Sequence, residues 1–299
     1  MPTASTPAAT YVSDPGTHWT VSDPGRLATL IRLRAVRMVA PQGFGYLGQA
    51  LSSAEQVAAL FATMRPGRDR LVCSPGHYVI GIFAAAAELG ILSAEAAAGY
   101  GLDGSPVEAI GTERSPVADY VCGSLGQGLS AAVGFALADR LRGKNRRTFA
   151  MVSDGELEEG QVWEAAMFAG HHRLSNLTVL LDANNSQVDG PVDTITTIEP
   201  IAAKWEAFGW TARDVDGHDV GAILDALAEA GQPAAGNTLP GTTGPGTTGQ
   251  PFVLINRTST TSGLRCLPPD ADGHFIKLPP ELAAAAEAEL LAELERNDG

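Results

Sequence analysis

Residues 148–182 read TFAMVSDGELEEGQVWEAAMFAGHHRLSNLTVLLD, and the pattern of these residues predicts the fold class. Apolar residues fill most of 148–153 and 177–182, and each of these segments has the length of a strand. Between them, 159–171 carries apolar residues at helical spacing. A strand, a helix and a second strand in this order form a βαβ unit, which joins parallel strands. Because both strands are largely apolar, we predict a parallel sheet that is covered on both faces.

The same alternation continues on both sides of this unit. A helix rich in small residues is predicted over 123–141, followed after the unit by a helix, a strand, a helix and a strand over 200–208, 210–215, 220–230 and 252–256. Asp23 and Pro24 begin an amphipathic helix, and Ser52 with Glu55 forms a capping box for a helix that runs to Met64. Further helices are predicted over 78–89 and 280–296.

We therefore predict a three-layer α/β domain over 23–299, in which a central parallel sheet lies between two layers of helices. Residues 1–22 are rich in Ala, Thr, Ser and Pro and are predicted to form a mobile tail. Residues 231–251 are rich in Gly, Pro and Thr, a composition typical of a flexible surface insertion.

Charge and cysteine content narrow the function classes. The 299 residues carry a net charge of −14, which disfavours binding to nucleic acid or to an anionic membrane surface. The three cysteines are far apart, which disfavours a disulfide framework or a thiolate metal site and fits a reducing cytoplasm. The sequence contains neither a secretory signal pattern nor an apolar run of roughly 18 residues that could cross a membrane. We therefore expect a cytoplasmic protein.

Two polar motifs follow the two strands of the βαβ unit. Asp154 and Gly155 come at the end of the strand over 148–153, and Asn184 and Asn185 follow the strand over 177–182. Open α/β sheets bind ligands outside the carboxyl ends of their strands, where these residues converge. A carboxylate, an amide oxygen and nearby carbonyls suit Mg²⁺, which keeps other positions for phosphate oxygens. The pair predicts a diphosphate site, although Asp-Gly alone is often a turn and Asn-Asn alone a loop with left-handed residues.

Longer segments around these motifs resemble the transketolases. They are GSLGQGLSAAVGFALA (123–138), ELEEGQVWEAAMFAGHHRLSNLTVLLDANNSQVDG (156–190), EPIAAKWEAFGW (199–210) and DGHD (216–219). The resemblance covers roughly residues 24–280. Within the family, the sequence most resembles the N-terminal half-chain of split, two-gene transketolases. It implies a thiamine diphosphate-binding fold with Mg²⁺, and a second subunit that carries the pyrimidine-binding and C-terminal domains, assembled as an α2β2 heterotetramer.

The resemblance also assigns roles to residues that match the family's motifs. It implies that the side chains of Asp154 and Asn184 and the carbonyl of Ser186 bind Mg²⁺, and that Gly155 contacts the diphosphate. His77, in SPGH, is implied to approach both cofactor and donor. The aminopyrimidine pocket is implied to consist of Gly123, Ser124 and Leu125.

Two further residues are assigned to proton transfer and catalysis. Glu159 matches the glutamate of a proton relay that links paired sites across the dimer, whereas by itself it is a glutamate in the first turn of a helix. His274, in DGHFIK, lies near the position of a late family histidine. The other histidines receive no role: His171 and His172 end a helix on its exposed side, His218 lies in a loop before a helix capped by Asp216 or Asp219, and His18 is in the tail.

Several positions depart from the transketolase pattern. Tyr46 stands where the family has the histidine of GHPG, and a second family histidine falls at Ser105 or Ala109. Ser262 stands where the family has a lysine. Histidines at such positions hydrogen-bond sugar hydroxyls and transfer protons, so the identity of donor and acceptor stays open.

Three functions are consistent with this sequence. The first is the cofactor-binding subunit of a two-component enzyme that transfers a two-carbon ketol unit from a ketose to an acceptor. The second is transfer of that unit, or of an acyl group from a 2-oxo acid, to a carrier thiol in specialised metabolism. The third is a scaffold subunit without catalytic activity. The intact SDG, NN and GSLGQG motifs favour the two enzymes over the scaffold.

Overall fold

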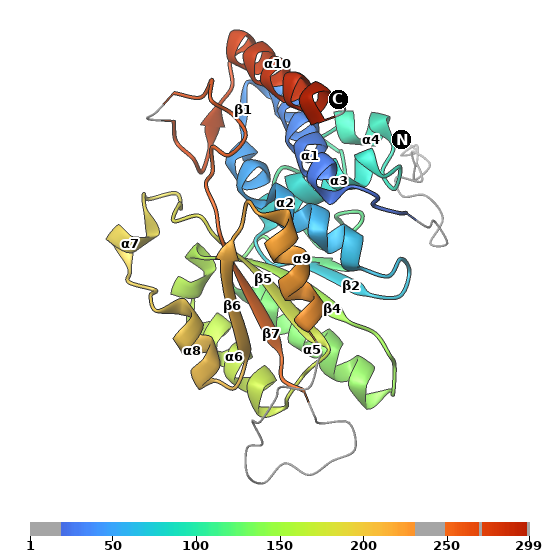
Figure 1. Cartoon of the computed structure of the whole chain (residues 1–299), viewed down its shortest axis with the longest axis vertical. Helices are drawn as coiled ribbons and strands as arrows, with labels where there is room; N and C mark the ends of the chain where they lie inside the picture. Colours follow the sequence, from blue (N-terminus) through green and yellow to red (C-terminus); the bar gives the residue numbers. More distant parts are fainter. Residues whose placement is uncertain (1–18, 231–248, 269–270, 298–299) are drawn as a thin grey trace, which may run out of the picture.

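A computed structural model describes residues 19–230, 249–268 and 271–297 (Figure 1). Within these residues, six parallel strands form one sheet in the order β3-β2-β4-β5-β7-β6. Their bounds are Arg70–Cys73 (β2), Tyr120–Val121 (β3), Thr148–Ser153 (β4), Leu177–Ala183 (β5), Thr211–Asp216 (β6) and Phe252–Arg257 (β7). The predicted parallel sheet is confirmed, and β4 and β5, the two strands within residues 148–182, lie side by side near its centre.

Helices cover both faces of the sheet (Figure 1). One layer contains α1 (Pro24–Val39), α2 (Leu47–Thr63), α3 (Val79–Glu88) and α9 (Val220–Glu229), with α10 (Pro280–Asn297) packed against α1. The other layer contains α5 (Gln127–Leu141), α6 (Gly160–His171) and α8 (Ile201–Ala207). Short helices α4 (Ala94–Ala98) and α7 (Val192–Ile195) lie in connections, and β1 (Phe44–Gly45) pairs antiparallel with β8 (Ile276–Lys277).

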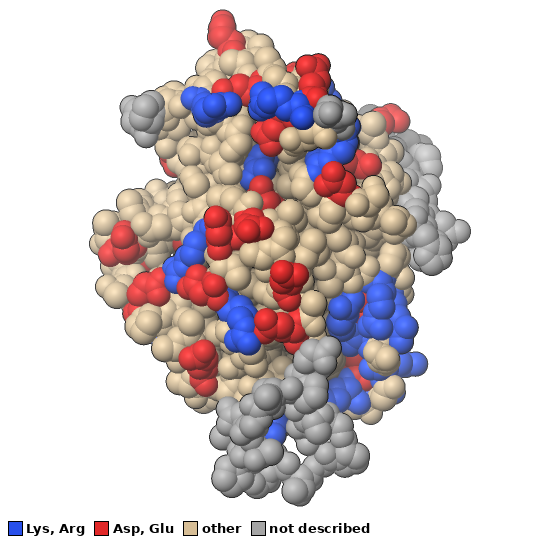
Figure 2. Space-filling model, in the orientation of Figure 1, with Lys and Arg blue, Asp and Glu red and all other residues tan. Residues whose placement is uncertain are grey.

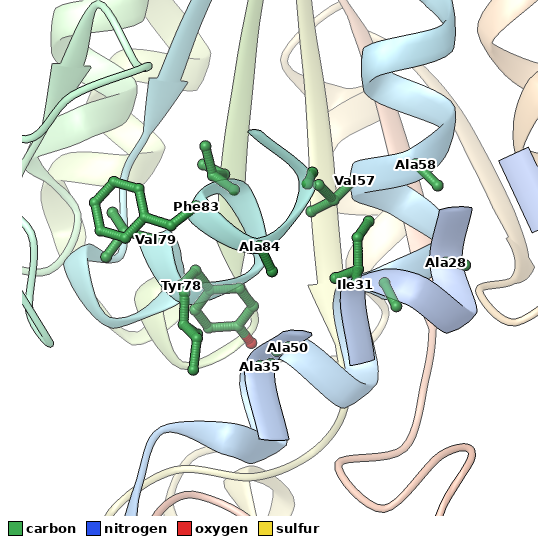
Figure 3. Packing of buried hydrophobic residues seen from close by; sticks show 14 of the residues in the cluster. Ala28, Ile31, Ala35, Ala50, Val57, Ala58, Tyr78, Val79, Phe83 and Ala84 are labelled. Atoms are coloured by element: carbon green, nitrogen blue, oxygen red, sulfur yellow. The ribbon is translucent and has the colours of Figure 1, made fainter. Parts of the chain in front are cut away.

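Alternate residues of each central strand face opposite layers. In β4, Phe149 and Met151 pack with the α1–α2–α3 layer, whereas Ala150 and Val152 pack with the α5–α6–α8 layer. All six residues of β4 and all seven of β5 are buried. Figure 3 shows part of the first layer's core, where small side chains such as Ala50 let the helices approach closely.

The edge strand β6 differs from this pattern. We predicted a sheet covered on both faces, but in β6 only Ala212 is buried. Its outer edge has no strand neighbour among the described residues, and the exposed side chains of Arg213 and Asp214 pair with Glu229 and Arg257 respectively.

The start of α1 is as predicted, but the start of α2 is not. The Asp23 Oδ1 accepts a hydrogen bond from the Arg26 backbone N–H at 2.9 Å, which caps α1. By contrast, α2 begins at Leu47, so the predicted capping box at Ser52 and Glu55 was wrong. Both residues lie inside the helix and are buried, where Glu55 pairs with Arg32 at 2.6 Å. Tertiary partners, rather than helix capping, account for these polar residues.

Other boundaries differ for local reasons. The helix predicted from 123 begins at Gln127, because Gly126 has a left-handed φ of 81° and ends the turn that precedes it. Within the predicted tail, the Trp19 side chain is bound to α2, because its Nε1–H donates to the Phe61 carbonyl at 3.0 Å. Residues 1–18 of that tail, and most of the predicted insertion, 231–248, lie outside the described residues. No described helix is long and apolar enough to cross a membrane.

Arginines gather at the amino-terminal end of the sheet, where Figure 2 shows a basic surface at the lower right. Two buried carboxylates anchor them. Asp69 accepts from Arg65 and Arg147, and Asp139 accepts from Arg70 at 3.0 Å. These ion pairs fix the loops that enter β2 and β4, at the edge of the sheet opposite the strand ends described next.

Candidate functional site

The carboxyl ends of β4 and β5 bring Asp154 and Asn185 into direct contact. The Asp154 backbone N–H donates to the Asp182 carbonyl at 3.0 Å, which continues the strand pairing. Beyond it, Asp154 Oδ2 accepts from the Asn185 N–H at 2.6 Å and Oδ1 accepts from the Gly155 N–H at 2.9 Å. Asn185 has a left-handed φ of 55°, so the second motif is also the left-handed loop that its sequence suggested. The predicted convergence of the two motifs is confirmed.

Three buried carboxyl groups lie near the carboxyl ends of β4 and β5. Asp154 is 2% exposed, Asp182 1% and Glu156 0%. Their hydrogen-bond partners among the described residues are all uncharged. Burial, and next the charge of Asp182, raises the pKa of Asp154 to about 7. Burial also raises the pKa of Glu156 to about 7, and it raises the pKa of Asp182. A bound cation would offset the cost of keeping these groups ionised.

Asn184 projects from the end of β5 beside Asp182. Its Nδ2 donates to Asp182 Oδ2 at 2.8 Å and to the Tyr78 hydroxyl at 2.9 Å. Its Oδ1 accepts from the Ser186 N–H at 2.9 Å. The amide nitrogen is thus turned toward the protein, and the amide oxygen lies on the side of the following loop.

Glu156 ties together three segments that the sequence had assigned to the site. Its Oε1 accepts from the Ser74 hydroxyl at 2.6 Å and from the Gly126 N–H at 2.7 Å, and its Oε2 accepts from the Ser153 N–H at 3.1 Å. The SPGH loop, the glycine-rich turn and the end of β4 are therefore fixed relative to one another. The turn presents Gly123, Ser124 and Leu125 to solvent.

The glycine-rich turn also needs its glycines for close packing. A Cβ on Gly128 would lie 2.4 Å from the Ser74 Cα, a distance that backbone atoms cannot accommodate without moving. The start of α5 therefore packs directly on the SPGH loop. Glu159 lies beside the same turn. A Cβ added to Gly126 would be only 2.9 Å from the Glu159 Cβ. Its side chain is exposed, at the residue that precedes α6.

Histidine and aromatic rings form a second part of the candidate site. The ring centroids of His77 and His274 are 5.0 Å apart, and Tyr46 lies 5.3 Å from His77 and 5.8 Å from His274. The ring centroids of Phe275 and Tyr46 are 5.2 Å apart, and the Gln49 Nε2 lies 3.3 Å from the His274 Nδ1. His274 is thus brought to His77 although nearly 200 residues separate them. Burial lowers the pKa of His77 to about 3, with His274 contributing, so His77 is a neutral imidazole at neutral pH.

The remaining residues that the sequence analysis singled out make hydrogen bonds within the protein. His218 accepts from the Ser259 N–H at 2.9 Å, and Asp219 caps α9, as one of the two alternatives predicted. Ser262, which replaces a family lysine, accepts from Arg32 at 3.2 Å. The Ser105 hydroxyl accepts from the Val107 N–H at 3.1 Å.

A cavity of about 250 Å³ borders Asp154 on the side of Asn185. Asp193 and Glu199 line it with one cation, Arg257, which already pairs with Glu199 and Asp214. The acidic lining of this cavity is therefore unsuited to a diphosphate. In the described part of the chain, no group of three or more His, Cys, Asp or Glu side chains is arranged to hold a metal ion. A cation beside Asp154 would thus need amide, carbonyl or exogenous ligands as well.

Several polar residues of this site were not predicted from the sequence, among them Ser52, Tyr78, Glu156 and Asp182. Asp182 carried a usable signal, because it is an acid at the end of a strand that is otherwise apolar. Glu156 lay within the SDGELEEG motif but has no spacing that separates it from its exposed neighbours. Ser52 and Tyr78 gave no signal, since their partner Asp182 is more than 100 residues away.

Residues 24–241 match the family described as transketolase, thiamine diphosphate binding domain. The chain belongs to the transketolase family. Among relatives, the 6-deoxy-6-sulfo-D-fructose transketolase subunit SqwG of Clostridium sp. (strain MSTE9) is 35% identical over 276 residues, which are 89% of this chain and 95% of that one. One of the subunits of apulose-4-phosphate transketolase from Actinobacillus succinogenes is 33% identical over 63% of this chain and 72% of its own length.

Longer transketolases match over part of their length only. Human transketolase is 31% identical over 90% of this chain but 42% of its own. The crystal structure of transketolase from Campylobacter jejuni superposes with a TM-score of 0.77 at 25% identity, over 89% of this chain and 42% of that chain. This transketolase-family chain therefore corresponds to the N-terminal, thiamine diphosphate-binding part of the longer proteins, which confirms the resemblance and fold expected from its sequence.

Proposed function

We propose that this chain is the thiamine diphosphate-binding subunit of a two-component transketolase-like enzyme. The enzyme transfers a two-carbon ketol unit from a ketose donor to an acceptor. Support comes from length: the chain spans most of two transketolase subunits but under half of the human enzyme. The missing part is supplied by a second subunit that carries the pyrimidine-binding and C-terminal domains, in an α2β2 assembly.

The convergence of Asp154 and Asn184 at the ends of β4 and β5 is the observation that carries this proposal. The residues fit a divalent cation, because the buried Asp154 carboxyl has only uncharged hydrogen-bond partners and the Asn184 amide oxygen is turned away from Asp182, toward the loop at Ser186. Asp154, Asn184 and the Ser186 carbonyl would hold Mg²⁺, and Gly155 would contact the diphosphate. Thiamine diphosphate, when bound, supplies a nucleophilic thiazolium carbon that serves as an electron sink for C–C bond cleavage.

The turn and the histidines would orient the cofactor and the donor. Gly123, Ser124 and Leu125 would line the aminopyrimidine pocket, held in place by Glu156 through Gly126. Being neutral, His77 can donate or accept a hydrogen bond with a donor hydroxyl, and His274 adds a second imidazole beside it. Glu159 would act in a proton relay once a partner subunit covers its exposed side chain.

The Tyr46 ring favours a donor other than the usual sugar phosphates. It packs against both His77 and His274, so an apolar ring occupies space beside the imidazoles where the family has a further histidine. A phenol near pH 7 does not exchange protons as an imidazole does. This observation supports a second candidate, in which a two-carbon or acyl unit from a 2-oxo acid passes to a carrier thiol.

Reconstitution with the partner tests the proposal. The product of the adjacent reading frame should co-purify with this chain, and calorimetry should show Mg²⁺-dependent binding of thiamine diphosphate. Ketose phosphates with aldose acceptors, and 2-oxo acids with a thiol carrier, should then be assayed in parallel. Lack of cofactor binding by both the chain and the complex would identify a scaffold and overturn the proposal.

A further inference from the structure

Behind Asn184, the Tyr78 hydroxyl and the Asp182 carboxylate form a buried polar contact. Tyr78 follows His77 and immediately precedes α3, and its ring lies in the apolar core with the hydroxyl end toward α2 (Figure 3). The hydroxyl donates to Asp182 Oδ2 at 2.8 Å. The same carboxylate also accepts from Ser52 and Gln56 on α2 and from Thr258 after β7. Asp182 is therefore an acceptor for five side chains, including Asn184.

This arrangement fixes which way the Asn184 amide points. A carboxylate has no proton to donate, so the Asn184 atom that faces it must be the NH₂ group. The single proton of the Tyr78 hydroxyl is used on Asp182, so the hydroxyl oxygen can only accept from Asn184. Asp182 and Tyr78 therefore both accept hydrogen bonds from the Asn184 amide nitrogen, and the amide oxygen faces Ser186.

We propose that Tyr78 and Asp182 are positioning residues that hold the Asn184 Oδ1 toward a divalent cation. The inference rests on the proposed function, in which Asn184 is a Mg²⁺ ligand. If the amide rotated by half a turn, its NH₂ group would face the cation and could not bind it. The free energy of metal binding then includes no cost of turning the ligand, because folding has already turned it.

Removing the Tyr78 hydroxyl provides the test. Calorimetry on the full-length chain, with thiamine diphosphate present, would measure the Mg²⁺ dissociation constant. Groups that orient metal ligands typically change metal affinity by about 10- to 100-fold, so we expect Tyr78→Phe to weaken Mg²⁺ binding at least ~10-fold and Asp182→Asn by more. The matched control is Tyr100→Phe, because the buried Tyr100 hydroxyl has no hydrogen-bond partner among the described residues. The control should bind Mg²⁺ as the parent does.

A double-mutant cycle separates positioning from general destabilisation. In an Asn184→Ala background there is no amide to orient, so Tyr78→Phe should cause no further loss of Mg²⁺ affinity. Equal losses in both backgrounds, or unchanged affinity in Tyr78→Phe itself, would overturn the inference. Failure of the parent to bind Mg²⁺ with thiamine diphosphate would instead overturn the metal site assumed in the proposed function. Tyr78→Phe keeps the test decisive even if Asp182→Asn does not fold.

Discussion

Replacing Asp154 with Asn removes one negative charge from the end of β4 and keeps the size of the side chain. The parent carboxyl is 2% exposed, and both oxygens accept backbone N–H bonds, from Gly155 and Asn185. It also lies close enough to Asp182 for that group to raise its pKa. In the metal-free chain we therefore expect the substitution to stabilise the fold at high pH.

The size and sign of this effect follow from the pKa of Asp154. Its ordinary value is 3.8, and burial together with Asp182 raises the folded value to about 7. Between these values the folded state holds a proton that the unfolded state has lost, so the free energy of unfolding falls as pH rises. At 1.36 kcal/mol for each pH unit, the loss approaches about 4 kcal/mol above pH 7 and is absent below about pH 4. The Asn variant lacks this loss.

Urea unfolding at about pH 4 and about pH 8, with a chelator present, measures the difference. Parent and Asp154→Asn should be nearly equal at the lower pH, and the variant should be more stable at the higher pH. Asp225→Asn, on the exposed surface of α9, removes the same charge without these neighbours and should show no such trend. Adding Mg²⁺ and thiamine diphosphate should narrow this difference, since only the parent gains about 2.7 kcal/mol at 100 times its dissociation constant. A variant that is no more stable at about pH 8 without metal would refute the reasoning.

Three further predictions concern packing, assembly and substrate. Gly128→Ala should lower the melting temperature and weaken cofactor binding, because its Cβ would meet the Ser74 backbone, whereas Gly134→Ala in the same helix meets nothing within 4 Å and should stabilise by about 0.5–1 kcal/mol. Calorimetric scans of both variants compare them directly. The purified chain alone should show no ketol transfer in a coupled assay, and turnover without any partner would contradict the two-component proposal. In the assembled enzyme, xylulose 5-phosphate and ribose 5-phosphate should be poor substrates, and Tyr46→His should raise their kcat/KM at least ~10-fold, within the range of a general acid–base group. Rapid turnover by the parent would show that Tyr46 does not decide the donor.

The sheet and one half of the site could be predicted because they depend on local patterns. The order of strands and helices over 148–182 determined the parallel pairing of β4 and β5. Parallel pairing then places Asp154 and Asn184 at one edge of the sheet without any knowledge of long-range contacts. Their convergence follows from the βαβ unit itself.

The other half of the site depends on contacts between distant segments. His274 reaches His77 through a loop that follows β7, and no periodicity in the sequence indicates that path. Ser52 and Glu55 show the same limit, because their spacing matches a capping box while Asp182 and Arg32 are their true partners. A capping motif identifies residue types that suit a helix start, but buried residues of the same types satisfy distant groups instead.

The buried carboxyl groups at the two ends of the sheet differ in whether arginines pair with them. At the amino-terminal end of the sheet, the buried Asp69 and Asp139 are each paired with arginines. At the carboxyl end, Asp154, Glu156 and Asp182 are equally buried, yet their partners in the described structure are hydroxyl, amide and backbone N–H groups. Uncharged donors orient a carboxyl group without neutralising it, so burial raises the pKa of these acids and a bound cation would favour their ionised forms. In the described structure, arginines pair with the buried acids at the amino-terminal end of the sheet, whereas Arg257 at the carboxyl end pairs with Glu199 and Asp214 instead. The buried acids at the carboxyl end are therefore left for a ligand to neutralise, which is the role proposed for Mg²⁺.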